Sequence, residues 1–151
     1  MALTLVIDTC VLVDMLISTR PRHERARRLR KEIVERGAVI LVPSFAMFEL
    51  SHALRQDLKL NSGKFAISYG LGPENGLDLE FVPTDVEFVR SSLALELPEL
   101  RAGDLVFAAL AKGRNLTLVT EDKALSLGSR EVGINCLSIK ECLVSVFGVD
   151  A

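Results

Sequence analysis

The chain alternates short, uninterrupted apolar runs with longer segments of helical pattern, and this alternation restricts its fold more than any other feature. A strand with one face in water shows apolar and polar residues in turn, whereas strands covered on both faces are apolar throughout. Apolar strands that alternate with helices form a parallel sheet with helices on each face. We therefore predict an α/β fold, a three-layer sandwich with strands at 3–7, 38–42, 79–82 and 116–119 and a weaker one at 136–138.

The segments between these runs carry helix signals. We expect helices at 11–17, 21–35, 44–58, 64–69, 84–97, 102–112, 122–127 and 140–147. Thr84 followed by Glu87 three residues later has the pattern of a capping box. Gly113 and Gly128 are expected to end the helices that precede them, because glycine is the usual residue after a helix C-terminus.

The 151 residues show no repeat and no domain boundary, so we expect one domain spanning 1–151. No apolar run reaches the roughly 18 residues of a membrane span, and the N-terminus lacks the basic region of a signal peptide. A cytoplasmic protein without membrane contact is therefore predicted. Its three cysteines form no CxxC pair, which disfavours zinc, and we expect Cys10, Cys136 and Cys142 to be buried free thiols.

Two aspartates follow predicted strands. Asp8 comes directly after the run at 3–7, and Asp122 comes shortly after the run at 116–119. Ligands of open parallel sheets bind beyond the carboxyl ends of the strands, where the strand order reverses. Both carboxylates would face one crevice if these two strands are neighbours. The alternative is that each aspartate only caps the helix that follows it.

Two further acids lie in apolar surroundings. Glu49 is flanked by Phe48 and Leu50, so it borders the apolar side of its helix, where an unpaired acid is disfavoured. Asp104 stands at the head of an apolar stripe that continues through Phe107. The alternative for Asp104 is a helix cap. These positions indicate a functional role for both acids.

Four carboxylates gathered in one place need a counter-charge. Two of them about 4 Å apart repel by roughly 4 kcal/mol at an effective dielectric constant near 20. They stay ionised together only if cations neutralise them. Oxygen ligands without a histidine or cysteine pair favour Mg²⁺ or Mn²⁺ over zinc. We therefore expect one or two such ions, held by Asp8, Glu49, Asp104 and Asp122.

The remaining polar features have more ordinary interpretations. Asp14 is expected in a solvated helix position, and His52 in an exposed or structural one. The basic stretch from Arg20 to Lys31 could follow an RNA backbone, receive an acidic partner segment or form a solvated helix face. Its candidate contact residues are Arg25, Arg27 and Arg28. With no tryptophan and one tyrosine, the chain shows no evident platform for stacking single-stranded RNA bases.

The sequence resembles the PIN-domain family of ribonucleases, and within it the VapC-like toxins of toxin–antitoxin pairs. The resemblance covers nearly the whole chain and rests on VIDTCVLVDML, PSFAMFELSHAL and RAGDLVFAALAKGRNLTLVTEDKAL. It implies a five-stranded parallel sheet in the order 3-2-1-4-5 and RNA cleavage that depends on Mg²⁺ or Mn²⁺. The positions that match the family's acids are Asp8, Glu49, Asp104 and Asp122.

The resemblance also implies supporting residues and partners. Thr120 and Thr9 match small hydroxyl positions beside the acids, whereas Cys10 and Leu105 depart from the family pattern, where Asn and Ala are frequent. A homodimer silenced by an antitoxin protein is implied. The alternatives are a silent PIN-like module that binds RNA or protein, and a nuclease of RNA processing or quality control. A phosphotransfer enzyme with Asp8 as nucleophile is a further rival.

Overall fold

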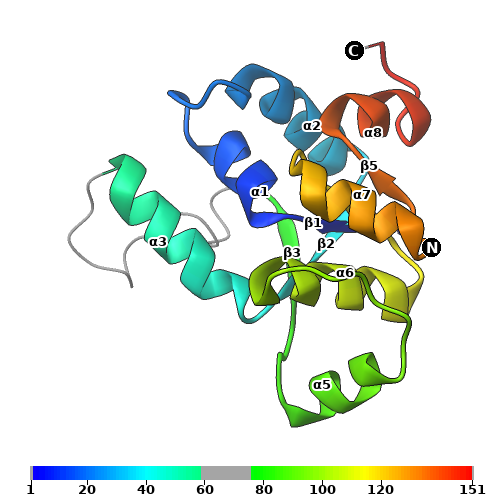
Figure 1. Ribbon diagram of the computed structural model, residues 1–151. Coiled ribbons are helices and arrows are strands. Elements are labelled where there is room, and N and C mark those ends of the chain that lie inside the picture. The colour runs from blue at the N-terminus through cyan, green and yellow to red at the C-terminus, as the bar shows by residue number, and fades with distance from the viewer. Residues whose placement is uncertain (1, 59–75, 151) are drawn as a thin grey trace.

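The computed structural model describes residues 2–58 and 76–150 (Figure 1). The helix expected at 64–69 lies outside the described residues. Within them, no helix combines the length and the apolar character needed to cross a bilayer.

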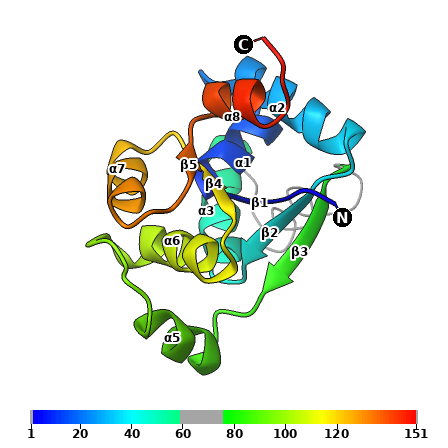
Figure 2. The same cartoon turned by 90° about the vertical axis from the view of Figure 1, so that its right-hand side faces the viewer.

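The described strands form one parallel sheet in the order β3-β2-β1-β4-β5. This confirms the predicted fold and strand order. The strands are β1 (Thr4–Ile7), β2 (Val39–Pro43), β3 (Asp78–Val82), β4 (Thr117–Val119) and β5 (Cys136–Leu137). β1 pairs with β2 on one side and with β4 on the other, so the strand order reverses at β1 (Figure 2). Ligands of open parallel sheets bind at this position, beyond the carboxyl ends of the strands.

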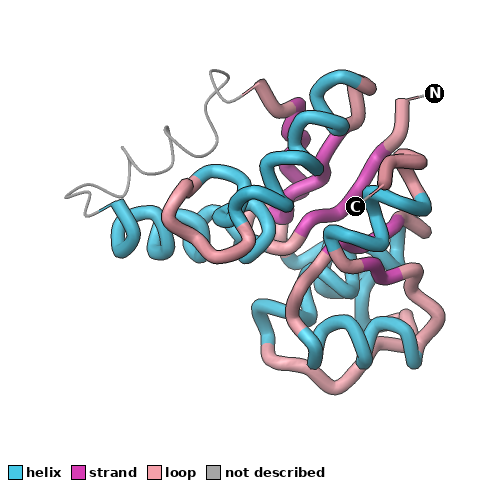
Figure 3. The backbone as a smooth tube through the Cα atoms, turned by 90° about the horizontal axis from the view of Figure 1, so that it is seen from above, coloured by secondary structure: helices cyan, strands magenta, loops and turns pink. Residues whose placement is uncertain are grey.

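Helices lie on both sides of the sheet (Figure 3). On one side α1 packs against α2 and α3, and α8 packs against α2. On the other side α6 lies against the central strands, with α5 and α7 packed on it. The described helices are α1 (Thr9–Leu16), α2 (His23–Glu35), α3 (Ala46–Leu58), α5 (Val86–Leu93), α6 (Ala102–Arg114), α7 (Lys123–Glu131) and α8 (Ile139–Ser145).

Burial follows the strand position in the sheet. Leu5, Val6 and Ile7 of β1 are completely buried, as expected of a central strand covered on both faces. The edge strand β3 departs from the expected continuous burial, because only Val82 of its five residues is buried. Its Phe81 is 42% exposed. The core therefore centres on β1, β2 and β4, the three central strands of the sheet.

The capping box expected at Thr84 is wrong. The N-cap of α5 is Asp85, whose carboxylate accepts a hydrogen bond of 2.9 Å from the backbone N–H of Phe88. Thr84 instead accepts a 3.2 Å hydrogen bond from the N–H of Phe45, at the start of α3. The helix also ends at Leu93, four residues earlier than expected.

Two glycines expected to end helices lie inside them. Gly113 belongs to α6, which continues to Arg114 and ends at Asn115 in the left-handed conformation, with φ 53°. Gly128 belongs to α7. A Cβ atom at Gly128 would lie 3.0 Å from the Cβ atom of Pro98. Glycine is therefore suited to this position because it lets two chain segments approach closely.

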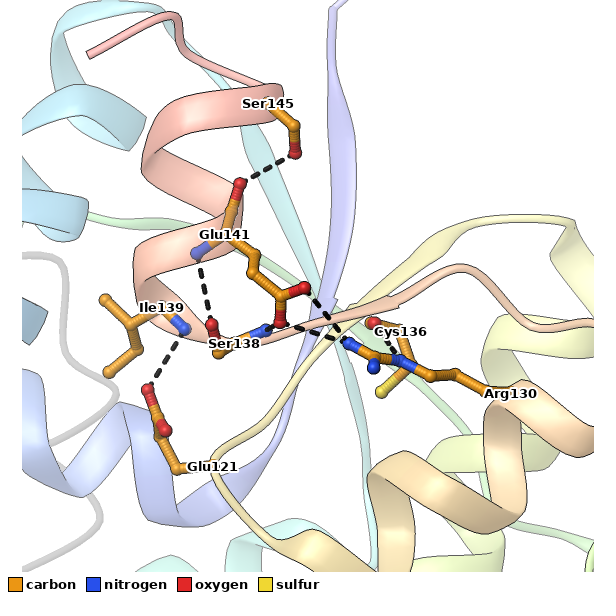
Figure 4. Close-up of polar contacts among 7 residues, drawn as sticks. All are labelled: Glu121, Arg130, Cys136, Ser138, Ile139, Glu141 and Ser145. Carbon is orange, nitrogen blue, oxygen red and sulfur yellow. Dashed lines mark hydrogen bonds and ion pairs between the residues drawn. The ribbon is translucent and has the colours of Figure 1, made fainter. Parts of the chain in front are cut away.

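Polar contacts fasten the C-terminal elements to one another (Figure 4). Ser138 and Glu141 form a capping box at the start of α8. Arg130 of α7 donates to the Glu141 carboxylate at 3.0 Å and to a carbonyl of β5. Glu121, between β4 and α7, accepts from the N–H of Ile139 at 3.1 Å. These bonds hold in place the turn that carries Asp122.

Candidate metal centre

Asp8 occupies the N-cap position of α1 without capping it. Its backbone is extended, and its carboxylate makes no hydrogen bond to the helix N-terminus. One carboxylate oxygen, Oδ2, instead accepts a 2.7 Å hydrogen bond from the Thr120 hydroxyl. The side chain is 5% exposed. A buried carboxylate that is bonded across the sheet does not fit the simple capping role, so the cap interpretation of Asp8 loses its basis.

Thr120 connects the ends of the two central strands. The register pairs Ile7 with Val119, and the N–H of Asp8 donates to the Val119 carbonyl at 3.0 Å. Thr120 therefore stands opposite Asp8, and it is only 2% exposed. Its hydroxyl oxygen also accepts a 3.0 Å hydrogen bond from the N–H of Asp122. One threonine thus fixes both the first and the last of the four acids.

Asp122 is the N-cap of α7. Its Oδ1 atom accepts a 2.8 Å hydrogen bond from the N–H of Leu125, so the capping interpretation is correct for one oxygen of this carboxylate. Thr120 and Asp122 also line a hollow of about 330 Å³, which extends past Lys123 toward Arg130. Asp122 therefore combines a structural bond with access to solvent.

Glu49 lies in the first turn of α3, between two other helices. Its Oε1 atom accepts a 3.2 Å hydrogen bond from the hydroxyl of Thr9 at the start of α1. Its Oε2 atom would be 3.0 Å from a Cβ atom at Gly103 of α6. The apolar border expected on both sides is half correct, because Leu50 is buried whereas Phe48 is 77% exposed.

Asp104 lies in the first turn of α6, which brings a fourth carboxylate to the same edge of the sheet. The N-cap of this helix is Arg101, so Asp104 is not the capping residue. Arg101 is close enough to lower the pKa of the Asp104 carboxyl, yet burial and the neighbouring Asp122 raise that pKa overall. Asp104 is partly buried.

Burial and mutual repulsion raise the pKa of three of these carboxyl groups, those of Asp8, Glu49 and Asp104. Burial raises the pKa of Asp8 from 3.8 to about 6, the Thr120 hydrogen bond opposes this rise, and the charges of Asp104, Glu49 and Asp122 add to it. Burial also raises the pKa of Glu49, again with a contribution from Asp104 and opposed by Thr9. The four acids predicted from the sequence therefore lie within electrostatic reach of one another.

The donor set fits a hard divalent cation in its chemistry. Four carboxylates supply the oxygen ligands that Mg²⁺ and Mn²⁺ prefer. Among the described residues, no lysine or arginine forms an ion pair with any of the four. In the same part of the chain, no group of three or more acidic, histidine or cysteine side chains is arranged so that it could hold a metal ion as it stands. The four acids are thus oxygen donors without an ion-pair partner among the described residues, and Arg101 offsets only part of the charge at Asp104.

Asp14 departs from its expected solvated position. It is 1% exposed, and its Oδ1 atom accepts a 3.0 Å hydrogen bond from Arg20, while Oδ2 has no hydrogen-bond partner among the described residues. Arg20 also reaches Asp57 of α3 at 3.4 Å. Arg20, which follows α1, thus links Asp14 of α1 to Asp57 of α3, and these two helices carry Thr9 and Glu49. His52 is exposed, as expected.

Cysteine burial is predicted correctly at two of three positions. Cys136 and Cys142 are buried, whereas Cys10 is exposed. Burial of the Cys10 sulfur, together with the charge of Asp8, nevertheless raises the pKa of its thiol to about 11. Cys10 is therefore a protonated thiol at neutral pH.

The candidate contact residues of the basic helix α2 form no ion pair with the four acids in the part of the chain that the structure describes. Arg27 pairs with Glu24 of the same helix at 2.6 Å, and Arg28 donates to the carbonyl of Asp150. Arg25 is exposed. Two of the three candidate contact residues thus already have partners within the chain, which favours the solvated-face interpretation for Arg27 and Arg28.

Three residues beside the acids were not identified from the sequence. Phe45 and Phe48 are exposed aromatic residues that precede Glu49, and Gly103 makes room for its carboxylate. The spacing of Phe45 and Phe48, one helical turn apart, was a signal for the aromatic pair. The role of Gly103 depends on contact between α3 and α6, which no local pattern reports.

The chain was compared with protein families, with curated proteins and with solved structures. The family model of the PIN domain matches residues 5–128. No curated protein matches the chain in sequence. Among solved structures, PAE2754 from Pyrobaculum aerophilum is similar, with a TM-score of 0.62 at 18% identity over 98% of this chain and 92% of that one.

Two further solved structures share the fold. VapBC2 from Rickettsia felis, bound to a DNA fragment from its promoter, has a TM-score of 0.58 at 15% identity and covers 90% of this chain and 97% of its own. FitAcB from Neisseria gonorrhoeae has a TM-score of 0.56 at 19% identity and covers 89% and 97%. At these identities the likeness concerns the fold.

Proposed function

The chain belongs to the PIN-domain family, and on that premise we propose that it is a nuclease that hydrolyses RNA phosphodiester bonds with Mg²⁺ or Mn²⁺. The observation that carries the proposal is the bond of Thr120 to a buried Asp8 whose pKa the other three acids raise. Protein interiors seldom gather ionised carboxylates without a cation, so such a group favours a metal site.

The ligands we propose are Asp8, Glu49, Asp104 and Asp122. A bound ion would supply positive charge that polarises the phosphate and makes the attack of water easier. We propose that one or two ions bind, and a metal titration would measure this number. Among the acids, Asp8 and Asp104 are proposed as direct ligands, because neither is used as a helix cap.

The protein's own contribution is to hold the carboxylates in fixed positions. Thr120 keeps one oxygen of Asp8 oriented and leaves the other free of hydrogen bonds to described residues. Thr9 does the same for Glu49. Glu49 is suited to orient the attacking water and take up its proton, since burial raises the pKa of its carboxyl. Asp122 anchors α7 with one oxygen and faces the adjoining hollow.

The biological role we propose is that of the toxin of a toxin–antitoxin pair. The solved relatives VapBC2 and FitAcB support this role by fold, and the motif resemblance to VapC-like toxins supports it by sequence. The chain would then act as a homodimer and be silenced by an antitoxin. A cytoplasmic location remains a prediction. Co-expression with a small protein from an adjacent gene should abolish RNA cleavage if this role is correct.

A second candidate function is a silent PIN-like module that binds RNA or protein. It is favoured by the lack of a completed ligand shell among the described residues. The two candidates differ in one assay. Cleavage of single-stranded RNA is measured with Mg²⁺, with Mn²⁺ and with EDTA, for the wild-type protein and for Asp8→Asn.

We expect cleavage with either ion, none with EDTA, and a loss of at least a hundredfold in Asp8→Asn. The control is Asp85→Asn, which removes a carboxylate from an exposed helix cap of α5. RNA cleavage that persists in EDTA, or is equal in Asp8→Asn, would refute the proposed chemistry. RNA binding without any cleavage would leave the silent module.

A further inference from the structure

Two phenylalanines lie exposed at the start of α3, immediately before Glu49. Phe48 is 77% exposed and Phe45 is 37% exposed. They are three residues apart in a helical turn, since the N–H of Phe48 donates to the carbonyl of Phe45 at 3.2 Å. Residues at this spacing occupy one side of a helix. Aromatic surface left in water is unfavourable, so a pair of exposed rings indicates a contact that is made with another molecule.

The aromatic pair adjoins the acids in space as well as in sequence. The Phe45 ring would be 3.6 Å from a Cβ atom at Gly103, and the Glu49 carboxylate would be 3.0 Å from the same atom. Gly103 directly precedes Asp104. The Phe45 ring and the Glu49 carboxylate therefore meet at Gly103, the residue before Asp104. In the fold, the start of α3 lies beside the start of α6 (Figure 1). A nucleotide whose phosphate lay at the acids would place its neighbouring base near these rings.

A hollow of suitable size opens at the pair. Its volume is about 390 Å³, and it is lined by Ser44, Phe45, Met47, Phe48 and Thr84. This volume lies in the range of small-molecule sites and is too small for a docked helix. Apolar and aromatic walls in a hollow of this size match the flat face of a nucleobase.

Two hydroxyl groups at the rim of the hollow keep their protons available. Ser44 Oγ accepts a 2.9 Å hydrogen bond from the N–H of Thr84, and Thr84 Oγ1 accepts from the N–H of Phe45 at 3.2 Å. In both bonds the hydroxyl oxygen is the acceptor, so the hydroxyl proton is not used. A hydroxyl can accept and donate at the same time. Both could therefore donate to an acceptor on the edge of a base.

We propose that Phe45 and Phe48 form a stacking platform for one base of single-stranded RNA next to the scissile phosphate. This inference rests on the proposed function, because the platform is placed relative to the acids that would cleave the RNA. Stacking on an aromatic ring tolerates every base, so the platform supplies affinity for unpaired nucleotides rather than sequence selection. Double-stranded RNA keeps its bases stacked on one another and cannot use the platform.

Binding is the appropriate measurement, because it does not depend on cleavage. The probe is a 12-nucleotide single-stranded RNA with a fluorescent end label, followed by fluorescence anisotropy in EDTA and again in Ca²⁺. The variants are Phe48→Ala, which removes the ring, Phe48→Leu, which keeps apolar bulk without a flat face, and Phe48→Trp, which enlarges it. We expect affinity to fall about tenfold in Phe48→Ala and in Phe48→Leu, and to be kept in Phe48→Trp.

The control variant is Leu93→Ala, at the end of α5, a helix that carries none of the four acids; this residue is 76% exposed. We expect its RNA affinity to be unchanged. A double-stranded RNA of equal length should bind equally to wild type and Phe48→Ala. Thermal unfolding of each variant, with an unchanged midpoint, shows that the fold is kept.

Two results would overturn the platform. Full affinity in Phe48→Leu would mean that only apolar bulk matters. Unchanged RNA affinity in Phe48→Ala, with a changed molecular mass in light scattering, would mean that the hollow contacts protein. A failure of the proposed nuclease function would give a different result. The wild type would then bind RNA through Phe48 but would not cleave it with Mg²⁺ or Mn²⁺.

Discussion

Replacing Asp8 with asparagine should stabilise the metal-free protein while removing its activity. The carboxylate is 5% exposed, and its pKa is raised from 3.8 to about 6 by burial and by three neighbouring acids. At neutral pH the folded protein therefore carries a negative charge in an unfavourable place. Asparagine keeps an oxygen that can accept the Thr120 hydrogen bond and has no charge.

The size of the effect follows from the pKa difference between the folded and unfolded states. A shift of about two units corresponds to about 3 kcal/mol, at 1.36 kcal/mol per unit. Because the folded-state pKa of Asp8 is raised, the penalty is absent below about pH 3.8, grows through the window up to about pH 6 and is complete above it. Asparagine brings a buried amide whose desolvation costs roughly 1–3 kcal/mol. The difference is a net gain of up to about 2 kcal/mol at pH 7.5.

Thermal unfolding in EDTA measures this gain. For a chain of this length, a gain of up to about 2 kcal/mol corresponds to an increase of up to about 8 °C in the melting temperature of Asp8→Asn. The difference from wild type should shrink at pH 5, where about half of the penalty remains. In 10 mM Mg²⁺ the difference in melting temperature between Asp8→Asn and wild type should become smaller or change sign. The reason is that only the wild type gains stability from tight metal binding. Asp85→Asn, at the exposed cap of α5, should change the melting temperature little in any condition.

A lower melting temperature for Asp8→Asn in EDTA at pH 7.5 would refute this reasoning, because it would show that the carboxylate stabilises the apo fold. An equal gain at pH 5 and pH 7.5 would show that the effect is unrelated to the charge of Asp8.

Three further predictions concern the surroundings of the acids. Gly103→Ala should lower RNA cleavage about tenfold with little loss of stability, since the new Cβ atom would meet the Glu49 carboxylate at 3.0 Å; equal cleavage rates for Gly103→Ala and wild type would contradict this. Thr120→Val should cost about 1.5–3 kcal/mol in urea unfolding, because it removes a hydrogen bond to a buried carboxylate, whereas an unchanged unfolding midpoint would argue against that bond. Mn²⁺ affinity should decline as pH falls below about 6, because Asp8 then takes up a proton that competes with the ion; calorimetric titrations at pH 5, 6 and 7 would reveal a flat profile if another group governs binding.

The central part of the fold was predictable because its signals are local. Continuous apolar runs identify β1, β2 and β4, and strand-end positions identify Asp8 and Asp122. Glu49 and Asp104 were identified by their apolar neighbours. The structure confirms the sheet and brings these acids within electrostatic reach, as the raised pKa of Asp8 shows.

The errors arose where a distant residue decides the outcome. Asp14 looked solvated, because its partner Arg20 lies beyond the end of α1 and outside the reach of helical spacing. Thr84 looked like a cap, but it bonds to the start of α3, and the adjacent Asp85 caps α5 instead. Gly128 resembled a helix end and instead permits close packing against Pro98. Non-local contacts of this kind leave no periodic pattern.

The exposed aromatic pair shows a different limit. Counting tryptophan and tyrosine alone suggested that no stacking surface exists, because the seven phenylalanines were left out of that count. Phe107 and Phe147 are buried, whereas Phe48 is 77% exposed beside a proposed metal ligand. Residue type predicts burial only on average.

The central claim is that the four acids form one metal site, and direct binding of Mn²⁺ tests it most directly. Calorimetric titration of the metal-free protein at pH 7.5 should show one or two ions per chain. Asp8→Asn and Asp104→Asn should each weaken binding at least tenfold, while Asp85→Asn binds as the wild type does. Equal Mn²⁺ affinity in wild type, Asp8→Asn and Asp104→Asn would contradict the claim.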